Sequence, residues 1–177
     1  MKKIFLDLDE CLVNSHYISD KFNKEEAITI ANTLSFKFNV VNGYSYNFSF
    51  EEYISFVRPH AQDFVKRVED EFGKENVRIL TQSIESYAVP ICEHFFGIKG
   101  YRVLDRDDIR GKSNVFEDYE CLLVDNLPQE DPLSEAKIKF LGTGVKYHQI
   151  HPYDIYSHSD GHREEFDRMV KLLKDEL

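Results

Sequence analysis

The chain has 177 residues, of which 42% are hydrophobic and 14% aromatic, and this composition is typical of a globular domain rather than a disordered segment. Its formal net charge is −10, from 22 basic and 32 acidic residues. This balance argues against a broad basic surface for nucleic acid, but it leaves room for one phosphorylated group in a locally positive pocket.

The sequence first predicts a buried strand and then a helix. Residues 3–8 form a short apolar run that ends in acidic residues, which is typical of a strand in the middle of a sheet. Asn23, with Glu26 three positions later, has the spacing of a capping box. A helix is therefore predicted over 24–34.

Alternating aromatic residues make the next pattern the clearest local one. They extend over 36–48, on both sides of Asn42-Gly43, and predict a β-hairpin with a two-residue turn. The hairpin is expected either to cover a binding site as a flap or to pack on the body of the fold. Residues 14–57 depart from the rhythm of the remaining chain, so we interpret them as a small cap inserted into a single domain over 1–177.

The rest of the chain alternates helices with short apolar strands. Ser49 and Glu52 offer a second capping box before Arg58-Pro59. Helices are predicted over 60–72, from a cap at Ser83 to Phe96, and around the apolar stripe of Phe166, Met169, Val170 and Leu173. Strands are predicted at 77–80, 101–104, 121–125 and 145–150. The alternation indicates an α/β fold, with a parallel sheet covered by helices on both faces.

Polar side chains follow three of the predicted strands. Asp7 and Asp9 end the first, Thr81 the second and Asp125-Asn126 the third. Burying carboxylates without a cation or hydrogen bonds is costly, so their placement suggests a purpose. In open α/β sheets, ligands bind beyond the carboxyl ends of the strands, where these side chains can meet.

The chemistry of these side chains fits a magnesium site. Hard oxygen ligands suit Mg²⁺, which also bridges to phosphate oxygens. Lys112 follows in the sequence and can neutralise further negative charge. Such a set suits phosphoryl transfer, in which positioning and charge neutralisation supply most of the catalysis.

Four segments resemble, in order, the motifs of the haloacid dehalogenase (HAD) superfamily phosphatases. Residues 7–13 are similar to the first motif, D-x-D-x-T/V, with Cys11 where Thr or Val is usual. Residues 80–83 resemble the second motif and 123–128 the fourth, while Lys112 fits the third. Arg110 and Lys99 lie in the same interval as Lys112 and are alternatives. The resemblance implies a HAD-like Rossmannoid parallel sheet with helices on both faces and a small cap containing the hairpin.

The resemblance also implies a role for each residue. Asp7 would attack phosphorus and form an aspartyl-phosphate, and an ordinary Asp, with a pKa of about 4, is an anion at neutral pH. Asp9 would act as general acid and then general base. Thr81 and Lys112 would bind the phosphoryl oxygens. Asp125 would hold Mg²⁺ together with Asp7 and the backbone carbonyl of Asp9.

The same segments suggest two classes of substrate. Arg58-Pro59, 80–88 and 124–128 look most like the RNA polymerase II C-terminal-domain phosphatase group, and 124–128 also look like the 5′(3′)-deoxyribonucleotidases. The substrate is therefore expected to be phosphorylated Ser or Thr in a protein, or a nucleotide monophosphate. Two rival functions stay open: a phosphotransferase, and a non-catalytic phosphate-binding or scaffold protein that keeps the fold.

Cysteine usage bears on the location of the protein. Cys11, Cys92 and Cys121 are scattered, odd in number and without C-x-x-C spacing, which favours reduced core thiols over disulfides. No segment has the length of a transmembrane helix, and acidic residues interrupt the first apolar run too early for a signal peptide. We therefore expect a cytoplasmic protein without a membrane partner.

Overall fold

A five-stranded parallel sheet forms the centre of the chain, in the order β6-β5-β1-β7-β8. The computed structural model describes residues 2–19, 23–33, 37–44, 50–111, 115–156 and 161–176. The strands of this sheet are β1 (Lys2–Leu6), β5 (Val77–Leu80), β6 (Val103–Leu104), β7 (Glu120–Asp125) and β8 (Lys146–Gln149). This confirms the predicted α/β fold with a parallel sheet.

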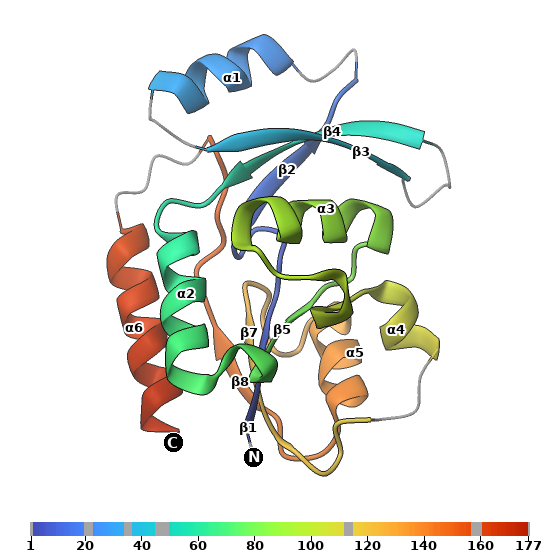
Figure 1. The fold of residues 1–177 in the computed structure, drawn as a ribbon, viewed down its shortest axis with the longest axis vertical. Helices are drawn as coiled ribbons and strands as arrows, with labels where there is room; N and C mark the ends of the chain where they lie inside the picture. The colour runs from blue at the N-terminus through green and yellow to red at the C-terminus, as the bar shows by residue number, and fades with distance from the viewer. Residues whose placement is uncertain are drawn as a thin grey trace.

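Helices cover both faces of the sheet (Figure 1). One face packs against α2 (Ala61–Phe72), α3 (Glu85–Phe96) and α6 (His162–Asp175), and the other against α4 (Arg106–Gly111) and α5 (Pro132–Leu141). The central strand shows why, because Ile4 and Leu6 belong to the first core and Phe5 to the second, and all three are fully buried. Two short 3₁₀ helices, η1 (Lys74–Asn76) and η2 (Gly100–Arg102), precede β5 and β6.

A second, smaller sheet lies above the carboxyl ends of the parallel strands (Figure 1). It is antiparallel, in the order β2-β4-β3, and is built from β2 (Val13–Tyr17), β3 (Phe38–Tyr44) and β4 (Phe50–Val57). Helix α1 (Lys24–Thr33) supplies Ala27 and Ala31 to a small core beneath it, with Ile54, Phe56 and Ile155. Apart from Val13, the first residue of β2, these elements lie within 14–57, the segment that the sequence predicted to be a cap.

The cap contains a hairpin, but it pairs β3 with β4 and is therefore not the hairpin predicted within 36–48. Asn42 and Gly43 lie inside β3, where they pair with Glu52 and Glu51 of β4. The two-residue turn predicted there is therefore wrong, and the connection falls at 45–49, outside the described residues. An Asn-Gly pair tolerates turn geometry but does not require it, and the antiparallel pairing with β4 prevails.

Three other local predictions need correction. Glu52, expected in a capping box, lies in the middle of β4. The strand predicted at 101–104 is only the two residues of β6, because η2 occupies the preceding positions. Helices α4 and α5 were not predicted at all, and α5 carries a residue that is central to the site described below.

A buried arginine joins the end of the small sheet to the body of the fold. Arg58 follows β4 and is 1% exposed. Its guanidinium donates to the carbonyls of Cys11 at 3.2 Å and His151 at 2.7 Å, and to Nδ1 of His162 at 3.2 Å. It also lies over the ring of Phe166, 4.9 Å from the centroid. Four distant segments of the chain are thereby held together.

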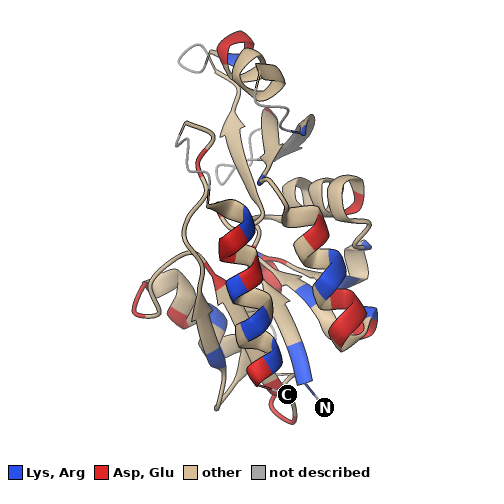
Figure 2. Cartoon of the chain, turned by 90° about the vertical axis from the view of Figure 1, so that its left-hand side faces the viewer, with Lys and Arg blue, Asp and Glu red and all other residues tan. Residues whose placement is uncertain are grey.

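The outer surface of α6 carries charges of both signs. Acidic and basic residues alternate along this helix on the face drawn in Figure 2. Arg67 of α2 pairs with Asp167 of α6 at 2.5 Å, so part of this charge is neutralised locally. Within the described ranges, no helix combines the length and the apolar character needed to cross a bilayer.

Candidate active site

Three strand ends meet beside the central strand. Because β1 lies between β5 and β7, Asp7 lies beside Thr81 and Asp125, which follow or end these neighbours. The Asp7 N–H donates to the carbonyl of Val124 at 2.9 Å, which ties the residue to β7. The chain runs from β1 outward to β6 and returns to β7 on the other side, so this point is a topological switch, where α/β sheets bind ligands.

A tight turn after β1 separates the two aspartates. The N–H groups of Leu12 and Val13 both donate to the carbonyl of Leu8, at 2.9 and 3.1 Å, and Glu10 adopts a left-handed conformation with φ of 58°. Cys11, which departs from the HAD motif, is fully buried inside this turn. A small apolar side chain therefore fits at this position.

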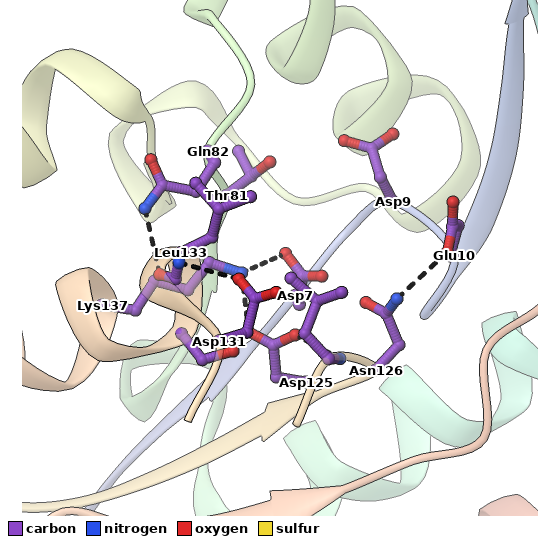
Figure 3. A network of polar contacts seen from close by, with 12 residues as sticks. Asp7, Asp9, Glu10, Thr81, Gln82, Asp125, Asn126, Asp131, Leu133 and Lys137 are labelled. Carbon is purple, nitrogen blue, oxygen red and sulfur yellow. Dashed lines mark hydrogen bonds and ion pairs between the residues drawn. The ribbon is translucent and has the colours of Figure 1, made fainter. Parts of the chain in front are cut away.

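A buried lysine connects two of the predicted site residues. Lys137 of α5 places its Nζ 2.7 Å from Asp7 Oδ1 and 2.7 Å from Asp125 Oδ2 (Figure 3). The three side chains are 2%, 7% and 0% exposed. The other oxygen of Asp125 accepts from the N–H of Leu127 at 3.0 Å. A compact cluster of two carboxylates and one ammonium thus lies at the centre of the site.

Burial and charge shift the protonation of this cluster. Burial raises the pKa of Asp7 to about 7, against the opposing influence of the Lys137 ammonium. Burial alone would lower the pKa of Lys137, but the carboxylates of Asp7 and Asp125 raise it above its ordinary value. Asp7 is thus less acidic than the sequence suggested. Additional positive charge at the site would favour its ionised, nucleophilic form.

Asp9 faces a different set of partners. Its carboxylate accepts hydrogen bonds from Ser83 Oγ, at 2.6 Å, and from the hydroxyl of Tyr87 in α3. Figure 3 shows Asp9 on the far side of the site from Lys137. Ser83 was predicted to cap α3, but Ile84 precedes the helix without a side-chain cap, and the serine hydroxyl binds Asp9 instead. Asp9 therefore has its own hydrogen-bond partners, separate from the cluster of Asp7, Asp125 and Lys137, and this arrangement is compatible with the separate role predicted for it.

We expect Tyr87→Phe to move the pH profile of the reaction to higher pH. Burial raises the pKa of Asp9, while the hydrogen bonds from Ser83 and Tyr87 stabilise the carboxylate and oppose that rise. Removing the tyrosine hydroxyl therefore raises the pKa of Asp9 further, because the carboxylate loses one of the two hydrogen bonds that stabilise it. In the role predicted from the sequence, Asp9 acts first as a general acid and must be protonated, so the alkaline limb of kcat/KM should shift to higher pH.

Tyr53→Phe is the matched control for this variant. The ring of Tyr53 lies 5.2 Å from that of Tyr87, centroid to centroid, but its hydroxyl donates to Glu51 rather than to Asp9. Its pH profile should equal that of the wild type. An alkaline limb that stays in place or moves to lower pH in Tyr87→Phe would show that the hydroxyl does not tune Asp9.

The remaining predicted residues surround a small cavity. It has a volume of about 200 Å³ and is lined by Asp7, Asp9, Glu10, Thr81, Gln82, Ser83, Asn126, Leu127, Leu133 and Lys137. Thr81 Oγ1 accepts from the Ser83 N–H at 3.0 Å, which leaves the threonine hydroxyl hydrogen available to a ligand. Asn126 donates to Glu10 at 3.2 Å, across the mouth of the turn after β1 (Figure 3).

Within the residues that it describes, the structure does not place the cation predicted for the third motif in the site. Lys112 lies outside the described residues, so its predicted role stays a prediction. One alternative, Arg110, is exposed on α4 and does not line the cavity. Lys137 was not predicted from the sequence. Two signals for its helix were present: Asp131 followed by Pro132 is typical of a helix start, and the next residues have helical spacing. The buried residues Ser134, Lys137 and Phe140 lie on one face of this helix.

The donor set around Asp7 is compatible with a magnesium ion. Asp7 and Asp125 already direct one oxygen each at a single cation, the Lys137 ammonium. Carboxylate oxygens are the ligands that Mg²⁺ prefers, and it keeps several waters of its own. Among the residues that the structure describes, no three side chains of Asp, Glu, His or Cys gather as a metal site, so the ligands in this chain would be two carboxylates and a backbone carbonyl.

Two solved structures share this fold. One is the fission yeast RNA polymerase II CTD phosphatase Fcp1, as a variant bound to beryllium fluoride, with a TM-score of 0.53, 13% identity and 97% of the present chain covered. The other is described as Fcp1, an essential RNA polymerase II CTD phosphatase, with a TM-score of 0.54, 13% identity and 98% covered. The chain spans 50% of the length of each. A comparison with curated proteins found no match.

The sheet order and the shared fold define an α/β protein with acidic residues at the ends of neighbouring parallel strands. A family profile, that of the NLI interacting factor-like phosphatases, matches residues 2–130. The chain belongs to this family. The match confirms the resemblance to HAD phosphatases that the sequence suggested.

Proposed function

We propose that this chain is a Mg²⁺-dependent phosphomonoester hydrolase that removes phosphate from phosphorylated Ser or Thr in a protein. The observation that carries the proposal is a small cavity lined by Asp7, Asp9 and Lys137, in which Lys137 also contacts the buried carboxylate of Asp125 behind the lining. Family membership supports phosphatase chemistry, and the polymerase phosphatases with the same fold support a protein substrate.

In the proposed reaction, an oxygen of Asp7 attacks phosphorus in line and the bond to the substrate oxygen breaks. Asp9 gives its proton to that leaving oxygen, and Asp7 carries the phosphoryl group as an aspartyl-phosphate. Asp9, now ionised, takes a proton from water, which attacks phosphorus and releases phosphate and free Asp7. When bound to Asp7, Asp125 and the Asp9 carbonyl, Mg²⁺ would supply neutralisation of phosphoryl charge.

Thr81 and the loop after β7 complete the proposed phosphoryl site. The free hydroxyl hydrogen of Thr81 can donate to a phosphoryl oxygen, and Asn126 supports the opposite side. We retain Lys112 as the predicted third-motif cation. A site of this kind works through position and charge, since little covalent chemistry is asked of the protein.

The size of the cavity favours a phosphorylated side chain of a larger molecule. About 200 Å³ is below the usual range for pockets that enclose a whole small molecule, about 300–1,000 Å³. We propose that the small sheet and α1, within 14–57, form an open cap that a polypeptide approaches from outside. The three buried free thiols, Cys11, Cys92 and Cys121, support the cytoplasmic location expected from the sequence.

Phosphate release from a phosphoserine peptide and from a nucleoside monophosphate, each with Mg²⁺ and with a chelator, tests this function. We expect metal-dependent release with kcat/KM at least about tenfold higher for the peptide. Preference for the nucleotide would favour a nucleotidase. Transfer to an added alcohol without free phosphate would identify a phosphotransferase, and binding without turnover would identify a phosphate-binding protein.

A further inference from the structure

Lys137 reaches the site from an unexpected part of the chain. The family profile ends at residue 130, before α5 begins, so the match assigns this lysine no role. Within the described part of the chain, it is the cation found in ion-pair contact with Asp7. Helix α5 starts with Asp131 as its N-cap and Pro132 in its first turn, which fixes where the helix begins.

The helix that carries Lys137 is anchored on two sides. Ser134, one turn earlier on the same face, is fully buried, and its hydroxyl lies 3.1 Å from that of Tyr147 in β8. Tyr147 also donates to the carbonyl of Leu127, in the loop that follows Asp125, at 2.6 Å. The base of the lysine side chain is therefore fixed relative to β8 and to the loop that follows Asp125, while its four-carbon stem can still turn.

The Lys137 ammonium contacts both carboxylates that would hold the metal. Its nitrogen lies 2.7 Å from an oxygen of Asp7 and 2.7 Å from an oxygen of Asp125, the same two carboxylates that are proposed to hold Mg²⁺. Like charges a few ångströms apart repel strongly in a buried site. Binding of a divalent cation by this pair of carboxylates is therefore opposed by the ammonium as long as it keeps both contacts.

The Lys137 side chain has a second position available to it, in the cavity. Its side chain also lines the cavity of about 200 Å³, together with Thr81 and Asn126. A phosphoryl group beside Asp7 would lie in this cavity, within reach of an ammonium on a flexible stem. The same charge can thus serve the carboxylates before the metal binds and the phosphoryl oxygens afterwards.

We propose that Lys137 is a catalytic cation of this phosphatase, which neutralises Asp7 and Asp125 in the metal-free protein and turns to the phosphoryl group when a divalent cation takes these carboxylates. The inference rests on the proposed function. In this role, Lys137 weakens the binding of Mg²⁺ and speeds the transfer of the phosphoryl group. If the ion pair were purely structural, Lys137 would neither oppose the metal nor assist turnover. Its loss would then weaken folding, metal binding and turnover together.

Lys137→Met separates these roles, and Lys139→Met is the matched control because Lys139 is exposed on the same helix. Mg²⁺ binding is measured by calorimetry without substrate, and phosphate release with it. For Lys137→Met we expect Mg²⁺ affinity to rise at least about fivefold, and turnover at saturating Mg²⁺ to fall about 100-fold. The control should change neither quantity.

Lys137→Gln keeps a hydrogen-bond donor for the carboxylates and decides the matter if the Met variant does not fold. The same two opposite changes are expected of it. Unchanged or weaker Mg²⁺ affinity in the folded variant would overturn the role of Lys137, even if the wild type is an active phosphatase. Full turnover in the variant, with loss of turnover in Lys112→Met, would overturn it as well. A wild type that binds Mg²⁺ but releases no phosphate would instead overturn the proposed function.

Discussion

Asp7→Asn is expected to abolish turnover, with a loss of at least about 10⁴-fold in kcat. An amide nitrogen or oxygen at this position cannot form the acyl phosphate, so no alternative covalent route exists at the same geometry. The variant should fold, because Lys137 keeps its contact with Asp125 and a buried carboxyl with a raised pKa is replaced by a neutral group of equal size. Release of phosphate from an aryl phosphate measures the loss, and circular dichroism checks the fold.

A second variant shows where the phosphoryl group resides. An aryl phosphate has a good leaving group and little need of a general acid, whereas hydrolysis of the acyl phosphate still needs a base. Asp9→Asn should therefore accumulate phosphorylated protein, detected by intact mass after rapid quenching, and Asp7→Asn should show none. Turnover that survives in Asp7→Asn would reject Asp7 as the nucleophile.

Arg58→Ala is expected to lower the free energy of unfolding by about 3–5 kcal/mol. Its guanidinium is the hydrogen-bond donor that the structure gives to the carbonyls of Cys11 and His151 on this side of the core. Removal leaves buried acceptors without that donor and opens a cavity beneath Phe166. Such a loss is a large share of the about 5–15 kcal/mol that a domain of ordinary stability has.

Denaturation by urea, followed by circular dichroism, measures the effect of this substitution. Arg163→Ala is the control, because Arg163 is exposed on α6, and a change within about 0.5 kcal/mol is expected there. Because Cys11 belongs to the turn that presents Asp7 and Asp9, activity should fall together with stability. A decrease below about 1 kcal/mol in Arg58→Ala would show that the core closes around the missing side chain.

The parallel sheet could be predicted because its signals are local. Short apolar runs such as 77–80 and 121–125 are typical either of a buried strand or of a short buried helix. Because predicted helices flank these runs, the strand is the better prediction. The acidic residues at the strand ends were equally visible. Since parallel strands align their carboxyl ends, Asp7, Thr81 and Asp125 could be brought together without knowledge of the strand order.

The errors arose where pairing between distant segments overrides local preference. Asn42-Gly43 favours a turn, but the backbone there pairs with β4 instead. Ser83 has the chemistry of a helix cap, but Asp9, 74 residues away in sequence, takes its hydroxyl. Lys137 was missed for a related reason, because a single lysine in a short amphipathic helix is usually solvated, and only the tertiary structure shows that it is buried between two carboxylates.

The position of Lys137 after residue 130 has a practical consequence for anyone who wishes to express or transplant this domain. A fragment cut at the boundary of the family profile would retain Asp7, Thr81 and Asp125 but lose α5, β8 and α6. Two acidic groups would then face each other without their counter-ion, and Arg58 would lose His151 and His162. The smallest portable unit therefore extends through α6, 45 residues beyond the end of the family profile.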